Sequence, residues 1–183
     1  MEPKELLKGD KVALTAFSDC DIPYLTKWYN DMNFLRSYDY TSSFPKSESQ
    51  IAKIINDIRN SNDKYLFAIN FGNEVIGVCG YESILWNNGT AVIYIGIGSN
   101  KFRGRGLAKE AMTLAVEFAF YELNLHRLQL SVIAYNKNAI GLYESLGFTR
   151  EGIVREFVHR DNKRYDLYLY GLLKEEWIQN KNN

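Results

Sequence analysis

The stretch Ile95-Gly96-Ile97-Gly98-Ser99-Asn100-Lys101-Phe102-Arg103-Gly104-Arg105-Gly106-Leu107-Ala108 carries four of the chain's thirteen glycines. Residues 90–98, where it begins, are almost continuously apolar, which predicts a strand covered on both faces. Where it ends, small and apolar residues recur at helical spacing over residues 106–121. The stretch therefore predicts a glycine-rich turn between a buried strand and the start of a helix.

This turn has the composition of an anion-binding site. The first N–H groups of a helix have no partner within the helix and lie at the positive end of its dipole. Glycine lets a phosphate approach the backbone, and Arg103 and Arg105 add positive charge. We interpret the turn as a pyrophosphate cradle; a plain glycine-rich connection with two solvated arginines is the alternative.

The common nucleotide loops do not match this turn. A Walker loop needs Gly-Lys-Ser/Thr, which does not follow. A dinucleotide turn needs a third glycine, but Gly104-Arg105-Gly106 continues with Leu107-Ala108-Lys109. A nucleotide-binding protein that uses the turn in another way would be stabilised by NAD or ATP, and this stays a third possibility.

Periodicity and turn signals predict the other elements. Further strands are expected at residues 11–17, 65–71, 74–83, 127–133, 149–159 and 163–173. Further helices are expected from Ile22, over residues 46–59 with Ser47 as N-cap, and over residues 138–146 with Asn138 as N-cap. Residues 30–45, which are rich in aromatic side chains, are expected to be irregular. The order βααβββαβαββ predicts a mixed α+β sheet.

Composition excludes several classes of protein. The chain has 183 residues, 46% of them hydrophobic, which suits one folded domain. Twenty-two basic residues balance twenty-two acidic ones, so a nucleic-acid partner is not expected. Cys20, Cys79, His126 and His159 are isolated, so neither a metal site nor a disulfide is expected. Without a signal pattern or an apolar run long enough for a membrane span, we expect a cytoplasmic protein with no membrane partner.

Two motifs give the chain a family resemblance. Arg103-Gly104-Arg105-Gly106-Leu107-Ala108 resembles the Q/R-x-x-G-x-G/A signature of the GNAT acyltransferase superfamily. Asn136-Lys137-Asn138-Ala139-Ile140-Gly141-Leu142-Tyr143-Glu144-Ser145-Leu146-Gly147-Phe148 resembles its second signature, N-x-x-A-x-x-L-Y-x-x-x-G-F. The pattern is most similar to the branch of ribosomal-protein N-terminal and spermidine N-acetyltransferases.

The resemblance implies a fold as well as an activity. It implies a single N-acetyltransferase domain over residues 1–183, with a core at about 11–177. Its centre would be a mostly antiparallel, partly parallel seven-stranded sheet flanked by helices. The implied enzyme moves an acetyl group from acetyl-coenzyme A, without a metal, to a primary amine such as a protein N-terminus, a polyamine or another small amine.

The resemblance also implies roles for individual residues. The pyrophosphate of acetyl-coenzyme A would lie on Arg103, Gly104, Arg105, Gly106, Leu107 and Ala108. The pantetheine arm would run beside Ile95, Gly96 and Ile97, with Gly96 giving it and the acyl group room. Asn136 would bind the pantetheine amides, and Asn138, Ala139 and Leu142 would line the thiol end. Tyr143 occupies the general-acid position, and its other reading is an aromatic core residue.

The general base departs from the family pattern. Many members place a Glu on the strand before the phosphate turn, but residues 90–95 contain no carboxylate. Glu82, on the neighbouring strand, is the substitute we predict as a catalytic residue; a solvent-facing strand-end carboxylate is the alternative. Tyr94 ordering a chain of waters is a further option. Cys79, in an apolar strand, is expected to be a core residue, which favours direct attack in a ternary complex over an acyl-cysteine.

Acceptor selection is expected to involve residues 30–45 and the turn at 160–163. Asp31, Asp39 and Glu82 would attract a cationic amine, and the aromatic cluster around Trp28 and Tyr38 would line a pocket or close the core. A homodimer is possible through the apolar last strand, which carries Leu167, Leu169 and Leu172. The alternative function is a non-catalytic module of the same fold that binds acetyl-coenzyme A.

Overall fold

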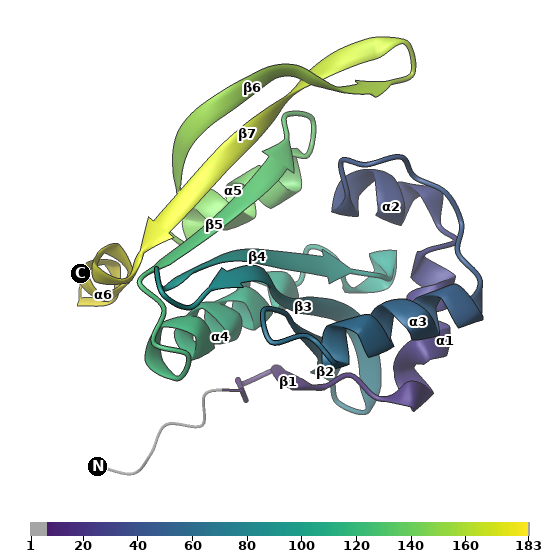
Figure 1. Ribbon diagram of the computed structural model, residues 1–183, viewed down its shortest axis with the longest axis horizontal. Helices are drawn as coiled ribbons and strands as arrows, with labels where there is room; N and C mark the ends of the chain where they lie inside the picture. The colour runs from purple at the N-terminus through teal and green to yellow at the C-terminus, as the bar shows by residue number, and fades with distance from the viewer. Residues whose placement is uncertain (1–6, 183) are drawn as a thin grey trace.

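Seven strands form one mixed sheet in the computed structural model, which describes residues 7–182 (Figure 1). The strands are β1 (Val12–Ala16), β2 (Tyr65–Phe71), β3 (Glu74–Leu85), β4 (Thr90–Ile97), β5 (Arg127–Ile133), β6 (Thr149–Arg160) and β7 (Lys163–Leu173). The helices are α1 (Ile22–Trp28), α2 (Met32–Tyr38), α3 (Glu48–Arg59), α4 (Leu107–Tyr121), α5 (Lys137–Ser145) and α6 (Lys174–Asn182). Of the expected domain 1–183, residues 1–6 and 183 lie outside the described part.

The sheet has the order β1-β2-β3-β4-β5-β7-β6, and each neighbouring pair is antiparallel except β4 and β5. This confirms the predicted mostly antiparallel, partly parallel sheet of seven strands. The parallel pair is short: it runs from Thr90 opposite Arg127 to Val92 opposite Gln129. Beyond these residues the two strands continue without pairing and diverge, as Figure 1 shows. The sheet therefore opens along one line in its middle.

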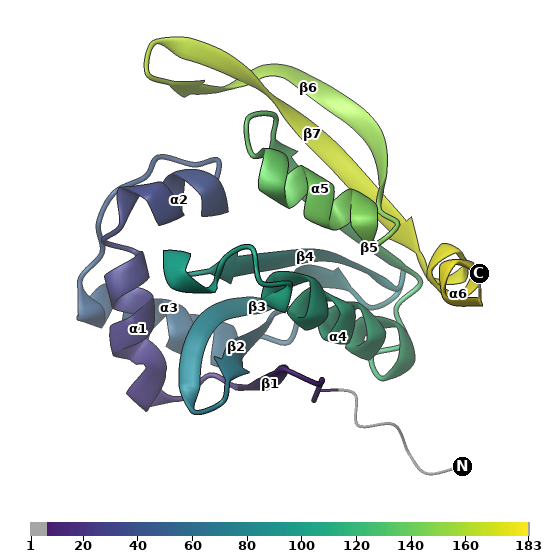
Figure 2. The same cartoon turned by 180° about the vertical axis from the view of Figure 1, so that it is seen from behind.

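Helices cover the sheet on both sides of this opening. On one face, α4 and α5 pack over β3, β4 and β5 in the larger core, which includes Tyr81, Ile93, Met112 and Leu130 (Figure 2). On the other face, α1, α2 and α3 pack over β2 and β3 in a second core. The prediction that the strand at residues 90–98 is covered on both faces fits this arrangement.

Two expectations about helices were wrong, and one helix was not predicted. Residues 30–45 contain the seven-residue helix α2, which Asp31 caps by accepting a hydrogen bond from the N–H of Asn33 (2.9 Å). α6 was not predicted, because its residues are mostly polar, although Trp177 is buried in the larger core. Asn136, not Asn138, caps α5, because the side chain of Asn136 accepts from the N–H of Ala139 (3.2 Å). Short helices carry too few turns for periodicity to show them.

The expected route to a dimer through the last strand was also wrong. β7 lies between β5 and β6, so both of its edges are already paired. Leu167 and Leu172 are 4% and 0% exposed and belong to the core; Leu169 is the exposed leucine of the three. The leucines of β7 therefore do not form a free face for a second copy.

Two findings concern residues 7–182 as a whole. None of the helices there has the length and apolar character needed to cross a membrane. Within the same residues, no three His, Cys, Asp or Glu side chains cluster in a way that would hold a metal ion.

A side chain at Gly80 of β3 would overlap with Tyr65 and Tyr94. A Cβ atom there would be 2.0 Å from the carbonyl oxygen of Tyr65 and 2.7 Å from the hydroxyl of Tyr94. That hydroxyl donates to the same carbonyl across the strand (3.2 Å). The absence of a side chain at Gly80 thus allows the Tyr94 side chain to cross β3.

Gly80→Ala is expected to lower the free energy of unfolding by about 2 kcal/mol, because the added methyl group meets the backbone of Tyr65. Urea denaturation measures the change. Gly141→Ala is the matched control: Gly141 lies in α5 with no atom within 4 Å of the new Cβ. It should raise the free energy of unfolding by about 0.5–1 kcal/mol, since alanine favours a helix over glycine. Equal effects of the two substitutions would contradict this account.

Candidate active site

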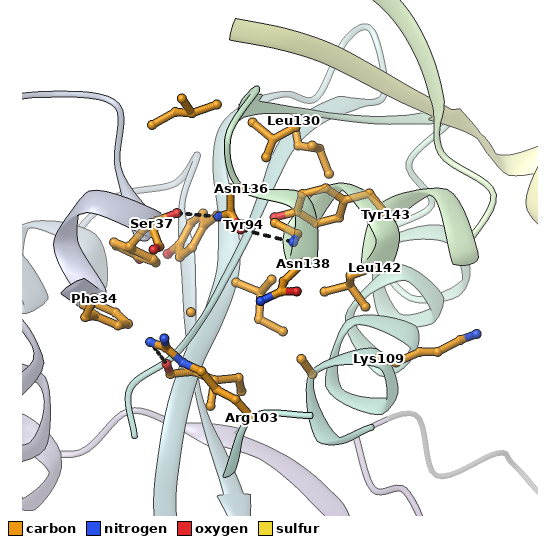
Figure 3. Close-up of a pocket in the computed structure, with 18 of the residues that line it drawn as sticks. Phe34, Ser37, Tyr94, Arg103, Lys109, Leu130, Asn136, Asn138, Leu142 and Tyr143 are labelled. Carbon is orange, nitrogen blue, oxygen red and sulfur yellow. Dashed lines mark hydrogen bonds between the residues drawn. The ribbon is translucent and has the colours of Figure 1, made fainter. Parts of the chain in front are cut away.

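A cavity of about 470 Å³ occupies the opening between β4 and β5 (Figure 3). Ile93 to Ile97 line it from β4, and Leu130 to Ile133 line it from β5. The remaining walls come from α2, the turn before α4, and α5. The strands cannot hydrogen-bond each other across this space, so an extended ligand has backbone groups to pair with there.

The turn before α4 forms one end of the cavity. Gly104 and Gly106 have φ values of +71° and +79°, a left-handed conformation that favours glycine. Gly106 is the N-cap of α4, and Leu107, Ala108 and Lys109 of the first turn line the cavity. Their N–H groups have no acceptor within the helix, and α4 is fifteen residues long. The turn therefore presents amides and a helix dipole to an anion.

The cations of this turn divide into two groups. Arg103 and Lys109 line the cavity, and Arg103 donates to the carbonyl of Ile97 (3.2 Å). Arg105 does not line it: its guanidinium lies 5.0 Å from the ring of Phe71 and 5.9 Å from that of Phe102. Arg105 was predicted as a direct ligand, but here it packs on the aromatic rings beside the turn.

Tyr143 of α5 lies at the cavity wall beyond this turn. It is 7% exposed, its ring packs 5.9 Å from that of Phe148, and Figure 3 shows it reaching from α5 towards Asn136. Burial raises the pKa of Tyr143 to about 12. Its hydroxyl is therefore protonated over the whole physiological pH range and can donate a proton or a hydrogen bond into the cavity.

Aromatic side chains line the other wall. Phe34 and Tyr38 of α2 stack with ring centroids 4.9 Å apart, and Tyr38 meets Tyr94 of β4 edge-on at 6.4 Å. Tyr40 and Asp39 follow α2 and also line the cavity. The aromatic residues therefore divide between the two expected roles. Tyr38 lines the cavity, whereas Trp28 is a buried core residue whose ring covers Gly98.

Glu82 lies near this wall but does not line the cavity. Its strand partner is Val92 and that of Tyr94 is Gly80, so Glu82 and Tyr94 share one face of the sheet. The side chain is exposed. Burial, and then nearby charges including Glu82, raise the pKa of Tyr38 and Tyr94. Glu82 therefore acts electrostatically on the tyrosines without contacting the cavity itself.

Two of the predicted donor residues line the cavity and also hold α2. A Cβ atom on Gly96 would be 2.7 Å from the ring of Tyr38 and 3.0 Å from that of Phe34, so Gly96 makes room for α2. Asn136 donates to the carbonyl of Ser37 (3.0 Å) and accepts from Ala139. Its amide keeps a second N–H and a second lone pair, so the predicted contacts of both residues with the donor stay predictions.

Of the other residues predicted to bind the donor, all line this one cavity: Ile95, Ile97, Arg103, Gly104, Gly106, Leu107, Ala108, Asn138, Ala139, Leu142 and Tyr143. Sequence reasoning missed Lys109 and the β5 residues Leu130–Ile133. Lys109 had a detectable signal, because it falls in the first turn of the helix that carries the glycines. The β5 residues had none, since their alternation is that of any half-buried strand.

The comparisons with known proteins agree with this architecture. A family model for the acetyltransferase (GNAT) domain matches residues 11–149. The chain belongs to the GNAT acetyltransferase family. Membership confirms the predicted enzyme class, an acetyl-coenzyme A-dependent N-acetyltransferase.

Relatives match over nearly the whole chain. The uncharacterised N-acetyltransferase p20 of Bacillus licheniformis is 28% identical over 94% of this chain and 98% of its own length. The ribosomal protein uS5-alanine N-acetyltransferase of Escherichia coli is 25% identical over 96% of this chain and 94% of its own. The crystal structure of spermidine N-acetyltransferase from Vibrio cholerae in complex with CoA and spermine superposes with a TM-score of 0.85 at 23% identity, over 93% and 99% of the two chains. This last match shows the fold.

The raised tyrosine pKa values predict how the stability of this GNAT enzyme depends on pH. Burial raises the pKa of Tyr29 and of Tyr143 to about 12, whereas an unfolded tyrosine titrates near 10. Between about pH 10 and pH 12 the folded protein holds protons that the unfolded chain has lost, so the free energy of unfolding falls as the pH rises.

Tyr143→Phe is expected to make this fall less steep, by up to about 1.4 kcal/mol per pH unit above pH 10. Urea titrations at a series of pH values measure it. Below about pH 9 the two slopes should match, because tyrosine is then protonated in both states. Identical slopes above pH 10 would contradict the burial of the Tyr143 hydroxyl.

Proposed function

We propose that the protein transfers an acetyl group from acetyl-coenzyme A to a primary amine by direct attack in a ternary complex. One observation carries the proposal: a single cavity runs from the amides at the start of α4 to Tyr143 of α5 on one wall and the tyrosines of α2 and β4 on the other. The first end suits a diphosphate and the second suits an amine and a leaving thiolate. Cys79 supports direct transfer, because it is fully buried and does not line the cavity.

The residues at the first end fit the donor. The left-handed glycines Gly104 and Gly106 leave open space above the turn, since no atom lies within 4 Å of a Cβ built on either. The α4 amides, with Arg103 and Lys109, would hold the pyrophosphate. Ile95 and Ile97 would offer backbone groups to the pantetheine arm from the part of β4 that pairs with β3 but not with β5.

Tyr143 is proposed as the general acid. When the amine attacks the thioester carbonyl, the C–N bond forms and the C–S bond breaks, and the sulfur leaves as a thiolate whose conjugate thiol has a pKa near 8.5. A buried phenol can stabilise that charge by a hydrogen bond or give it a proton. The hydroxyl of Tyr143 is protonated and reaches the cavity, so it can donate a hydrogen bond to the leaving thiolate. Because burial raises its pKa to about 12, this hydrogen bond is favoured over complete transfer of the proton.

Glu82 and Tyr94 are proposed to remove the proton that the ammonium group must lose. Tyr94 lines the cavity and donates its own proton to Tyr65, so its oxygen can still accept a hydrogen bond from the amine or from a water. Glu82 lies on the same face of the sheet and is exposed, so it would act through water as the final acceptor. Its position off the cavity is also the observation that favours the alternative function, an acetyl-coenzyme A-binding module without efficient transfer.

The acceptor is proposed to be a primary amine on a small molecule or on a peptide. The rings of Phe34, Tyr38, Tyr40 and Tyr94 suit a cation, and Asp39 adds a negative charge beside them. Relatives act on both kinds of amine, since the E. coli enzyme is named for an alanine of a ribosomal protein and the V. cholerae structure holds spermine. Asp31 is not part of this wall, because its carboxylate caps α2.

Incubation with acetyl-coenzyme A and a panel of peptides, polyamines and other amines, read by mass spectrometry, is expected to show an acetylated amine. Tyr143→Phe should lower kcat for that amine by about 10²-fold, the usual contribution of one general acid, and leave coenzyme A affinity unchanged. Isothermal titration measures the affinity. Tight coenzyme binding by the wild type with no acetylated amine would support the binding module instead. Full activity of the variant would remove Tyr143 from the mechanism.

Glu82→Gln is expected to lower kcat/KM for the amine by about 10²-fold and to alter the acidic limb of its pH–rate profile, because the carboxylate that receives the proton is lost. Glu122→Gln, at an exposed position after α4, is the matched control and should leave the profile unchanged. If both variants behave like the wild type, Glu82 is not the proton acceptor.

A further inference from the structure

We infer that Tyr135 and Asn136 are positioning residues that hold α2 against the amine end of the cavity and fix it relative to Tyr143. These two consecutive residues, here called the clasp, lie in the loop between β5 and α5. The inference rests on the proposed function, since it concerns how the same site recognises its amine.

α2 needs support from outside itself. It is seven residues long, well below the roughly 12–15 residues at which an isolated helix becomes stable in water. The last carbonyl groups of any helix also lack partners within it. Yet α2 places Phe34, Ser37 and Tyr38 on the cavity wall. Contacts from distant parts of the chain must therefore determine where this wall lies.

Tyr135 supplies the first contact. Its hydroxyl donates to the carbonyl of Arg36, in the last turn of α2 (2.5 Å). Its ring is fixed from the other side, because it packs edge-on against Tyr165 of β7 at 4.9 Å, beside Ile133. Tyr135 does not line the cavity. An anchored ring outside the site thus holds the backbone of α2.

Asn136 supplies the second contact and joins two walls of the site. Its Nδ2 donates to the carbonyl of Ser37 in α2 (3.0 Å), while its Oδ1 accepts from Ala139 at the start of α5 (3.2 Å). Figure 3 shows the amide between Ser37 and the helix that carries Tyr143. One side chain thus connects the helix of the amine wall to the helix of the proposed acid.

The tip of the β6–β7 hairpin reinforces the same end of α2. Nη2 of Arg160 donates to the carbonyls of Asp39 (2.7 Å) and Thr41 (3.1 Å), and Asp161 forms an ion pair with Arg36. These contacts reach the segment after α2 from β6 and β7, which line no part of the cavity. Asn136 of the clasp, in contrast, bonds both α2 and α5.

The clasp therefore controls amine recognition more than donor binding. The donor end of the cavity is built from β4 and the start of α4, and the side-chain hydrogen bonds of the clasp go to α2 and α5 instead; Asn136 also lines the cavity, whereas Tyr135 does not. If the clasp opens, the rings of α2 move away from Gly96 and Tyr94, while the turn at Gly104 and Gly106 keeps its shape. The KM for the amine should rise with little change in affinity for coenzyme A.

Two substitutions each remove one hydrogen bond to α2 and preserve the other contacts of the substituted side chain. Tyr135→Phe keeps the ring that packs on Tyr165 and loses the hydroxyl. Asn136→Asp keeps an oxygen that can cap α5 and loses the donor to Ser37. Each is expected to raise the KM for the amine by about two- to tenfold, the size of one neutral hydrogen bond. Tyr135→Phe, whose residue does not line the cavity, is expected to change coenzyme A affinity less than about twofold.

Amide hydrogen exchange gives a readout that does not depend on activity. In both variants exchange should quicken over α2 and stay unchanged over α5. Asn136→Ala, which also loses the cap, should quicken exchange over both helices. This pattern separates a positioning role from a general loss of stability.

Two matched controls complete the experiment. Tyr165→Phe removes a hydroxyl from the neighbouring ring without touching α2, and it should behave like the wild type. Asn138→Asp adds the same negative charge to the same cavity wall without a bond to α2, so exchange over α2 should not change.

The outcomes distinguish failure of the clasp from failure of the proposed acetyltransferase function. Unchanged exchange over α2 in Tyr135→Phe and Asn136→Asp overturns the clasp, as does a loss of coenzyme A affinity in Tyr135→Phe with an unaltered KM for the amine. Faster exchange over α2 in Asn138→Asp would assign the effect to charge and also overturn it. If the wild type acetylates no amine, the proposed function fails, and the exchange pattern still decides whether the clasp holds α2.

Discussion

The early end of pairing between β4 and β5 determines the rest of the site. Only three residue pairs join these parallel strands, from Thr90 opposite Arg127 to Val92 opposite Gln129. Both strands then continue into a space that holds no third strand, and unpaired backbone groups line it. Because the crossover α4 begins at the far end of β4, its first amides meet the same space. The end of the β4–β5 pairing thus places backbone groups that can bind an extended ligand next to helix amides that can bind an anion.

Glycines allow the helices to close around this break. Gly96 and Gly98 of the strand and its extension lie under the rings of Tyr38 and Trp28, so α2 and α1 approach the sheet without a side chain between them. Gly80 does the same for Tyr94 on the neighbouring strand. Gly104 and Gly106 serve a different need, since their left-handed backbone turns the chain into α4. The glycine-rich stretch therefore combines packing with ligand approach.

The two walls of the cavity differ in how they are held. The wall proposed for the donor consists of a strand, a turn and the start of a fifteen-residue helix, all close together in the sequence. The wall proposed for the amine depends on a seven-residue helix whose last carbonyls accept from Tyr135 and Asn136, about a hundred residues away, while Arg160 bonds the carbonyl of Asp39 just after it. Local contacts therefore hold the first wall, and long-range contacts hold the second.

The sequence by itself determined the strands, the glycine-rich turn and the position of Tyr143, because periodicity and the two motifs are local signals. Within Arg103–Ala108 it also predicted residues that the structure places on the cavity wall. Only the tertiary structure decided that residues 32–38 are helical, that Gly96 makes room for Tyr38, that Arg105 packs on Phe71, and that Asn136 binds Ser37. Each of these depends on contacts between residues far apart in the chain. A local sequence pattern does not determine which distant groups come into contact.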